Sequence, residues 1–141
     1  MLGVTDADDV HDANASFYAA FEARDLDAMA EVWERSDRVS VTHPGWPTLR
    51  GWPRVAGSWQ AIFSATPFIQ FVLTDEEVLV EGAVATVTLD ENILQSAGTT
   101  ELSGSKATTV NVFARDGHDA TWRMVVHHAS PVAGDDGPSA L

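Results

Sequence analysis

The sequence contains no cysteine, and only eight of its 141 residues are Lys or Arg. Without cysteine the chain can form neither a disulfide nor a thiolate metal site, and it has no thiol nucleophile. Such a composition suits a reducing compartment, so we expect a cytoplasmic location.

Positive charge is scarce, because 21 acidic side chains face 8 basic ones and the formal net charge is −13. A field of this sign repels phosphate backbones and anionic lipid surfaces. We therefore expect neither nucleic acid nor a membrane as a partner. The sequence also lacks an apolar run of 18 residues and a basic-then-apolar N-terminus, which predicts no membrane span and no signal peptide.

Hydrophobic residues are plentiful, at 45% of the chain, and they include five Trp and six Phe. This composition and length predict one domain with a packed, aromatic-rich interior. We place that domain at residues 1–132. The stretch 133–141 lacks apolar content and is predicted to be a flexible tail.

Three helices are predicted in the first half of the chain. Thr5 and Asp8 have the spacing of a capping box, and Asp25 can cap a second, shorter helix. A third helix is expected from Gly51 to Thr66. Each has an apolar face, formed by Val10, Ala13, Phe17, Ala20 and Phe21 in the first, Leu26, Met29, Val32 and Trp33 in the second, and Val55, Trp59, Ile62 and Phe63 in the third.

The rest of the sequence has the period-two pattern and turn signals of β-strands. We expect a strand at 38–43, an irregular loop at 44–51, and hairpin-connected strands at 68–79, 83–94, 106–115 and 120–132. This order predicts an α+β domain, in which a curved, mainly antiparallel sheet packs one face on the helices. The hollow between sheet and helices is the expected ligand site.

Four segments carry a family resemblance: 25–28 after a Phe/Tyr-containing helix, 37–45, the helix beginning at Gly51, and 122–128. Together they resemble the nuclear transport factor 2-like (NTF2-like) superfamily, and within it the SnoaL-like branch. The resemblance implies a cone-shaped α+β roll of the NTF2-like/cystatin-like kind and a homodimer. Members include isomerases, cyclases, dehydratases and non-catalytic binders, so the resemblance alone selects no activity.

Ketosteroid isomerases of this superfamily offer a residue pattern for comparison. Their general base precedes a Pro-Gly-type loop, and the matching position here is His43. Their two oxyanion donors match Phe17 and Asn111, and a pocket aromatic on the last strand matches His128. The resemblance therefore implies catalytic roles for His43, His128 and Asn111.

The histidines also qualify on their own chemistry. A neutral imidazole such as that of His43 at the edge of an apolar hollow is a usable general base, although a histidine at a strand end can equally be structural. His127 and His128 point to opposite faces of a strand, so only one can enter the hollow. Strand parity with Met124 favours His128, which leaves His127 as an interface residue.

A metal site is not expected. His43, His128 and Asp90 supply conceivable ligands, but no His-x-His or His-Glu-x-x-His spacing supports them. We expect no cofactor either.

For two sets of polar residues, the sequence allows more than one position and role. Asn111 lies among apolar residues and could donate to a developing oxyanion or be satisfied within the protein. Asp90 shares a strand face with Asn92, Thr86 and Thr88, for which we favour a solvated or interface position over a pocket wall.

The expected substrate-binding residues are mostly aromatic. Trp46 lies in the loop after His43, where it either covers the pocket or anchors the loop, and Tyr18 points either to the hollow or to solvent. Trp59 also belongs to a helix stripe that suits the core. The full set comprises Phe17, Tyr18, Trp46, Trp59, Phe63 and Met124.

Two classes of function follow. The first is a cofactor-independent enzyme that uses histidine acid–base chemistry for an isomerisation, cyclisation or dehydration of a small apolar, carbonyl-bearing or polyketide-like substrate. The second is a non-catalytic module that binds a ligand in the hollow or assembles as a dimer through the sheet.

Overall fold

The computed structural model describes residues 5–96, 98 and 100–133. Its helices are α1 (Asp6–Ala23), α2 (Leu26–Val32) and α3 (Trp52–Ala65), and its strands are β1 (Ser40–Thr42), β2 (Leu49–Arg50), β3 (Phe68–Glu81), β4 (Val84–Ser96), β5 (Ser103–Ala114) and β6 (Arg123–Pro131). The predicted flexible tail, 133–141, lies outside the described residues except for Ala133. No helix within the described part is long and apolar enough to cross a membrane.

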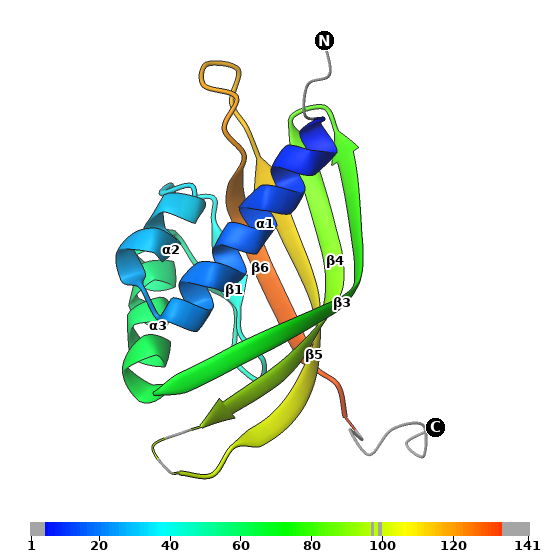
Figure 1. Cartoon of the computed structure of the whole chain (residues 1–141). Coiled ribbons are helices and arrows are strands. Elements are labelled where there is room, and N and C mark those ends of the chain that lie inside the picture. The colour runs from blue at the N-terminus through cyan, green and yellow to red at the C-terminus, as the bar shows by residue number, and fades with distance from the viewer. Residues whose placement is uncertain (1–4, 97, 99, 134–141) are drawn as a thin grey trace.

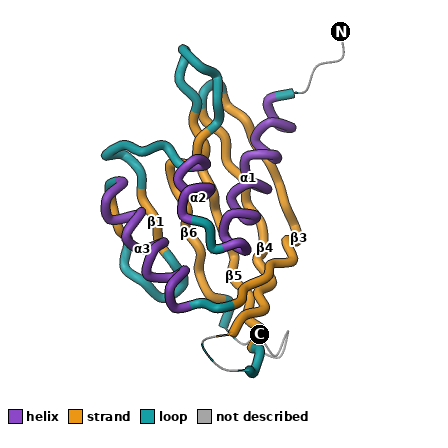
Figure 2. Tube along the Cα trace, turned by 60° about the vertical axis from the view of Figure 1, so that its left-hand side comes forward, coloured by secondary structure: helices purple, strands orange, loops and turns teal. Residues whose placement is uncertain are grey.

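One six-stranded sheet has the order β2-β1-β6-β5-β4-β3. β1 runs parallel to β6, and the other neighbours are antiparallel. The helices all lie on one face of this curved sheet, with α1 across β3 to β5 and with α2 and α3 beside β1 (Figures 1 and 2). The predicted α+β roll of three helices on a curved, mainly antiparallel sheet is confirmed.

The capping signals act as the sequence predicts. Thr5 and Asp8 form a reciprocal capping box at the start of α1, and the Asp25 carboxylate accepts a hydrogen bond from the backbone N–H of Ala28 at 3.0 Å. Within the loop expected at 44–51, residues 49 and 50 pair with β1 as the short strand β2. Two residues are too few to show a period, which is why the sequence gives no sign of this strand.

The core is an aromatic cluster between α1, α3 and the inner face of the sheet. Phe17 is fully buried, and its ring contacts those of Tyr18, Phe21, Trp59 and His127 at centroid separations of 4.8 to 6.0 Å. Aromatic pairs at such separations add about 0.5–1.5 kcal/mol each beyond the area they bury. Phe17 thus joins α1 to both α3 and β6.

Replacing Phe17 with Ala should lower the free energy of unfolding by about 3–5 kcal/mol, because the change opens a cavity where three elements meet. Urea unfolding followed by circular dichroism measures this. Leu102→Ala is the matched control, since Leu102 is 55% exposed and its loss should change stability by less than about 0.5 kcal/mol. Equal effects of the two substitutions would contradict this view of the core.

Candidate active site

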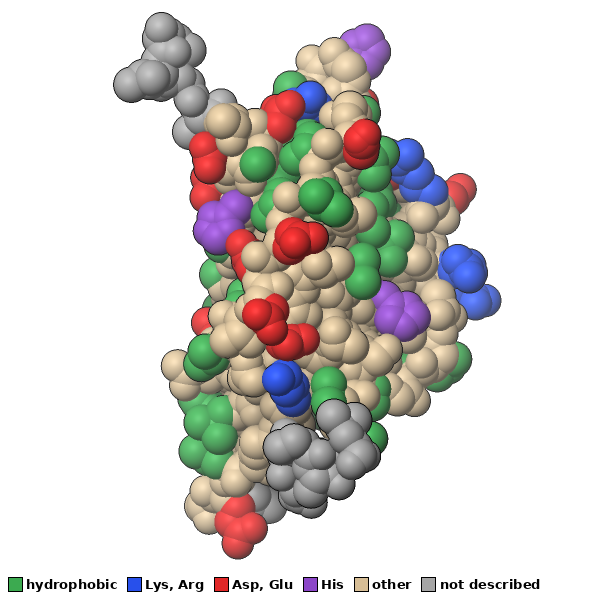
Figure 3. Space-filling model, turned by 90° about the vertical axis from the view of Figure 1, so that its right-hand side faces the viewer, with side chains coloured by type: hydrophobic (Ala, Val, Ile, Leu, Met, Phe, Trp, Pro, Cys, Tyr) green, Lys and Arg blue, Asp and Glu red, His purple; other side chains and the backbone are tan. Residues whose placement is uncertain are grey.

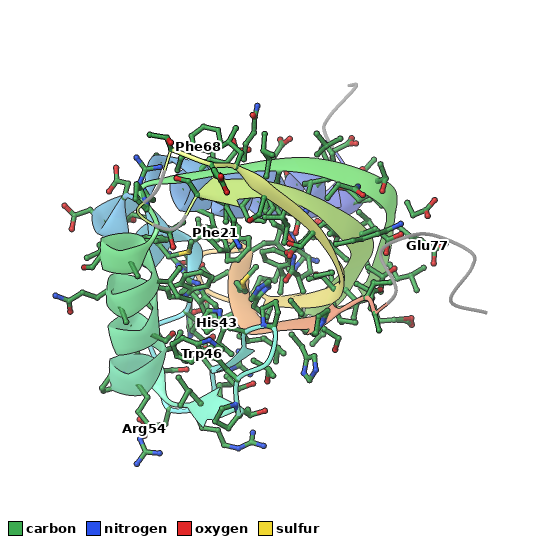
Figure 4. The ribbon with its side chains drawn as sticks, turned by 90° about the horizontal axis from the view of Figure 1, so that it is seen from below. Phe21, His43, Trp46, Arg54, Phe68 and Glu77 are labelled. Carbon is green, nitrogen blue, oxygen red and sulfur yellow. The ribbon has the colours of Figure 1, made fainter. Side chains whose placement is uncertain are left out.

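A cavity of about 270 Å³ lies between the helices and the concave face of the sheet. We call it the inner cavity. Phe21 and His43 both flank the interior beside α3, and Trp46 lies next to His43 (Figure 4). The complete lining is Phe21, His43, Pro44, Trp46, Ile62, Thr66, Ile69, Phe71, Glu91, Ile93, Gln95, Ser105, Lys106, Ala107, His127 and Pro131.

A larger groove of about 730 Å³ runs between α1, α2 and the turn before β6. Six of its lining residues are Ala, and its ionisable groups are the carboxylates of Asp9, Asp12 and Glu31, all at exposed positions. The inner cavity, by contrast, brings three buried ionisable side chains together. It is therefore the better candidate for chemistry.

Glu91 is the residue that the sequence reasoning missed. The residue is 2% exposed and lies on the face of β4 that carries Ala85, Val87 and Leu89. The Tyr18 hydroxyl donates to its Oε2 at 2.5 Å. Burial raises the pKa of Glu91 to about 7, although the hydrogen bond from Tyr18 acts in the opposite direction. A single carboxylate alternating with apolar residues along a strand was the signal available in the sequence.

Tyr18 supports this carboxyl group from α1. Burial, and next the charge of Glu91, raise the pKa of the Tyr18 phenol well above its ordinary value. The hydroxyl therefore keeps its proton and donates a hydrogen bond to Glu91, while its oxygen accepts one from the Asn111 amide at 3.3 Å. Tyr18 points away from solvent, but its hydroxyl meets Glu91 and does not line the cavity.

His43 follows β1 and faces the inner cavity, as predicted. The Ser58 hydroxyl donates to the Val55 carbonyl at 2.7 Å, so the Ser58 oxygen accepts from His43 Nε2 at 2.9 Å. The Nε2 proton leaves Nδ1 with its lone pair. Burial lowers the pKa of His43 to about 4, so the imidazole is neutral at pH 7.

His127 is the second histidine of the cavity. It is 1% exposed, and its Nδ1 lies 2.6 Å from Asn111 Oδ1. Burial, followed by the charges of His43 and His128, lowers the pKa of His127 well below its ordinary value. The Asn111 amide thus has its hydrogen-bond partners within the protein. It affects the cavity through its contact with His127.

The prediction that His128 faces the hollow and His127 the interface is wrong. His128 is exposed on the opposite side of the sheet. The reason is a register shift in β6, where Val112 pairs with Val126 but Phe113 pairs with Met124, so that Val125 is an extra residue. This bulge reverses the alternation after Met124, and Met124 and His127 therefore share the inner face.

The predicted substrate-binding residues divide into two groups. Trp46, 40% exposed, lines the inner cavity. The others do not line it: Tyr18 stands behind Glu91, and Phe17, Trp59, Phe63 and Met124 belong to the surrounding core or pack against it. The prediction that they contact a ligand directly is not supported by their positions. Asp90 and Thr88 lie on the outer face, as favoured.

No group of three or more His, Asp or Glu side chains within the described residues is arranged to hold a metal ion.

Helices wrapped on a curved sheet around a cavity with buried ionisable groups define an NTF2-like protein. The SnoaL-like domain family matches residues 10–134, which is most of the chain. The chain belongs to this family, and the resemblance seen in the sequence is confirmed.

Two solved structures are similar in sequence as well as in fold. A proposed dehydratase of the NTF2-like family from Streptomyces avermitilis is 40% identical, with a TM-score of 0.82 over 90% of this chain and 96% of that one. A proposed calcium/calmodulin-dependent protein kinase type II association domain from Thiobacillus denitrificans is 33% identical, with a TM-score of 0.75 over 86% of this chain and 94% of that one.

One curated relative is longer. The F-box protein SKIP8 of Arabidopsis thaliana is 28% identical over 123 residues, which are 87% of this chain and 49% of the relative. The chain therefore spans about half the length of the curated relative that it matches.

The raised pKa of Glu91 predicts how the free energy of unfolding depends on pH. Because its pKa is higher in the folded protein than the ordinary 4.5, Glu91 favours folding below pH about 4.5, and this contribution is lost as the pH rises through about 7. Glu91→Gln removes the titration. The free energy of unfolding of the wild type, minus that of the variant, should fall by on the order of 3 kcal/mol between pH 4.5 and 8. Urea unfolding at several pH values measures it, and parallel pH profiles would contradict the assignment.

Proposed function

We propose that the protein is a cofactor-independent small-molecule enzyme that transfers a proton through Glu91, either in a dehydration or in an isomerisation. One observation carries the proposal: a carboxyl group of pKa about 7 is buried in a cavity and held by a tyrosine. A general acid–base group works best when its pKa lies near the operating pH. The similarity to the proposed dehydratase supports the same reaction class.

In this proposal Glu91, rather than His43, is the general base. With a pKa of about 4, His43 is a weak proton acceptor, and burial holds the pKa of His127 low as well. Glu91 is a much stronger base in the same cavity. The neutral imidazoles instead accept hydrogen bonds from substrate, which positions it against the carboxylate.

For a dehydration, the steps balance with Glu91 alone. The Glu91 carboxylate removes the proton from the carbon next to a carbonyl, the bond from the neighbouring carbon to its hydroxyl breaks, and the proton passes from Glu91 to the departing hydroxyl to form water. For an isomerisation, the same proton returns to a different carbon. The cavity of about 270 Å³ is below the usual range of ligand pockets, which favours a one- or two-ring substrate over a tetracyclic polyketide.

Glu91→Gln should lower the rate by about 10²–10⁴-fold on a substrate found among small β-hydroxy ketones, because the amide cannot accept the proton. The rise of absorbance as the conjugated ketone forms measures it. In the wild type, kcat/KM should increase with pH up to about 7 and then level off, since the carboxylate is the active form. Asp90→Asn, on the outer face of the same strand, is the control. A fully active Glu91→Gln variant would remove the proposal.

A second candidate function is assembly, which the outer face of the sheet favours. Exposed apolar residues stand there on three strands: Val72 and Leu79 on β3, Val84 on β4 and Val110 on β5. Seen from the side turned away from α2 and α3, hydrophobic side chains lie among acidic ones (Figure 3). One similar structure is described as a kinase association domain. We propose that a second copy of the chain covers this face as a homodimer.

Val110→Lys should convert the dimer to a monomer, because it places a charge at the centre of the proposed interface. Light scattering during size-exclusion chromatography measures the mass, and circular dichroism checks that the fold is retained. Glu77→Lys, near the margin of the same face, is the control for a change of charge. A wild type that stays monomeric at all concentrations, or a Val110→Lys variant that stays dimeric, would exclude this interface.

A further inference from the structure

The inner wall of the cavity carries three polar side chains, those of His43, His127 and Glu91. The hydrogen bonds that each makes within the protein determine whether it can donate to a ligand or accept from it. Two chains of hydrogen bonds run from the cavity histidines to groups that can only accept. Because the last group of each chain can only accept, the donor and the acceptor of every hydrogen bond along the chain are determined.

The first chain ends on the carboxylate of Glu76. Asn14 donates its amide N–H to Glu76 Oε2 at 3.4 Å, so Asn14 turns its Oδ1 to Asn111, whose amide N–H donates to it at 2.9 Å. Asn111 is then left with Oδ1 toward His127 Nδ1, at 2.6 Å. Nδ1 must donate, and His127 Nε2 therefore holds a lone pair.

This chain is well fixed in place. Asn14 and Asn111 are both fully buried, so neither amide can turn to water. At the outer end, His11 Nδ1 lies 2.5 Å from Glu76 Oε1 and holds the carboxylate on α1. The β-bulge between Thr74 and Glu77 brings Glu76 to this position.

The second chain ends on the backbone carbonyl of Val55. Ser58 donates to this carbonyl, and its oxygen accepts from His43 Nε2. His43 Nδ1 therefore holds a lone pair, and no residue of the described part of the chain donates to it. The third group, the ionised Glu91 carboxylate, is an acceptor whose Oε2 is engaged by Tyr18.

The polar groups of the inner wall are thus all acceptors when Glu91 is ionised. The side chains that can donate, those of Trp46, Thr66, Gln95, Ser105 and Lys106, line the same cavity at less buried positions. A ligand with only acceptors at its buried end would leave unpaired acceptors facing one another, and each such loss costs about 1–3 kcal/mol.

We propose that the inner cavity binds a small neutral molecule by its hydroxyl groups, with the hydroxyl-bearing end inserted among His43, His127 and Glu91. A neutral ligand is favoured over an ammonium ion because most of the lining is apolar and two of the three acceptors are neutral. The inference rests on the proposed function only because it uses the same cavity. It identifies the substrate class by the hydroxyl group that the site binds.

Four probes of similar size test the proposal without any reaction: 1-phenylethanol, acetophenone, ethylbenzene and 1-phenylethylamine. At pH 8, where Glu91 is ionised, the alcohol should bind at least about tenfold more tightly than the ketone or the hydrocarbon, as measured by calorimetry or ligand-observed NMR. Equal affinity of alcohol and ketone, tighter binding of the amine, or no measurable binding of any probe would overturn the proposal.

Two variants locate the preference. His127→Gln can turn an amide N–H into the cavity and should reduce the preference for alcohol over ketone at least threefold, whereas His128→Gln on the opposite face should leave it unchanged. Should His127→Gln fail to fold, Ser58→Ala provides the same test at His43, because it frees that ring to offer its N–H. An unchanged preference in the folded variant would contradict the assignment of acceptors.

Nitrogen-15 NMR reads the tautomers directly. His43 should be protonated at Nε2 and His127 at Nδ1, and the opposite tautomer at either residue would overturn the inference. The probes do not react, so binding and activity are tested separately. If the wild type shows no preference for alcohol over ketone but Glu91→Gln abolishes activity, only this inference is refuted. A clear preference with an active Glu91→Gln variant would refute only the proposed function.

Discussion

The burial of one carboxyl group is the constraint on which the site depends. Glu91 lies on the apolar side of β4, where the Tyr18 hydroxyl donates a hydrogen bond to its carboxylate. Ionising such a group in a largely apolar setting is costly, so its pKa rises to about 7. The same burial has the opposite effect on the histidines, which lose affinity for protons. One physical cause thus gives the carboxyl group a pKa that suits its proposed role as proton carrier and leaves the imidazoles neutral.

The architecture places these groups without any loop having to hold them. Tyr18 is on α1, Glu91 on β4, Asn111 on β5 and His127 on β6, and each is packed in the core. Side chains on regular elements are held more precisely than side chains on loops. His43 follows β1 directly, and its bond to Ser58 on α3 fixes the ring.

Periodicity and capping signals in the sequence were enough to predict the helices, the long strands and their arrangement, because each long element carries its own pattern. The orientation of the His127–His128 pair was not predictable in this way. It depends on the extra residue Val125, and a bulge arises from pairing with another strand rather than from local sequence. Glu91 is recognisable in the sequence only as a lone carboxylate that alternates with apolar residues, a pattern too weak to single it out from its neighbour Asp90.

Each of the two proposed functions uses one face of the sheet. The inner face encloses a small cavity with acid–base groups, while the outer face exposes Val72, Leu79 and Val110. Of the two similar structures, one is described as a proposed dehydratase and the other as a proposed kinase association domain. Both uses are compatible in one molecule, because the cavity and the outer face lie on opposite sides of the sheet.

The most direct measurement is the titration of the Glu91 carboxyl carbon by carbon-13 NMR, in protein labelled at the glutamate side chains. Glu91→Gln, which lacks that signal, assigns the resonance. A midpoint near pH 7 is the result expected from a carboxyl group buried beside Tyr18. A midpoint near 4.5, the ordinary value for a solvated glutamate, would show that water reaches the group and would contradict its role as the proton carrier.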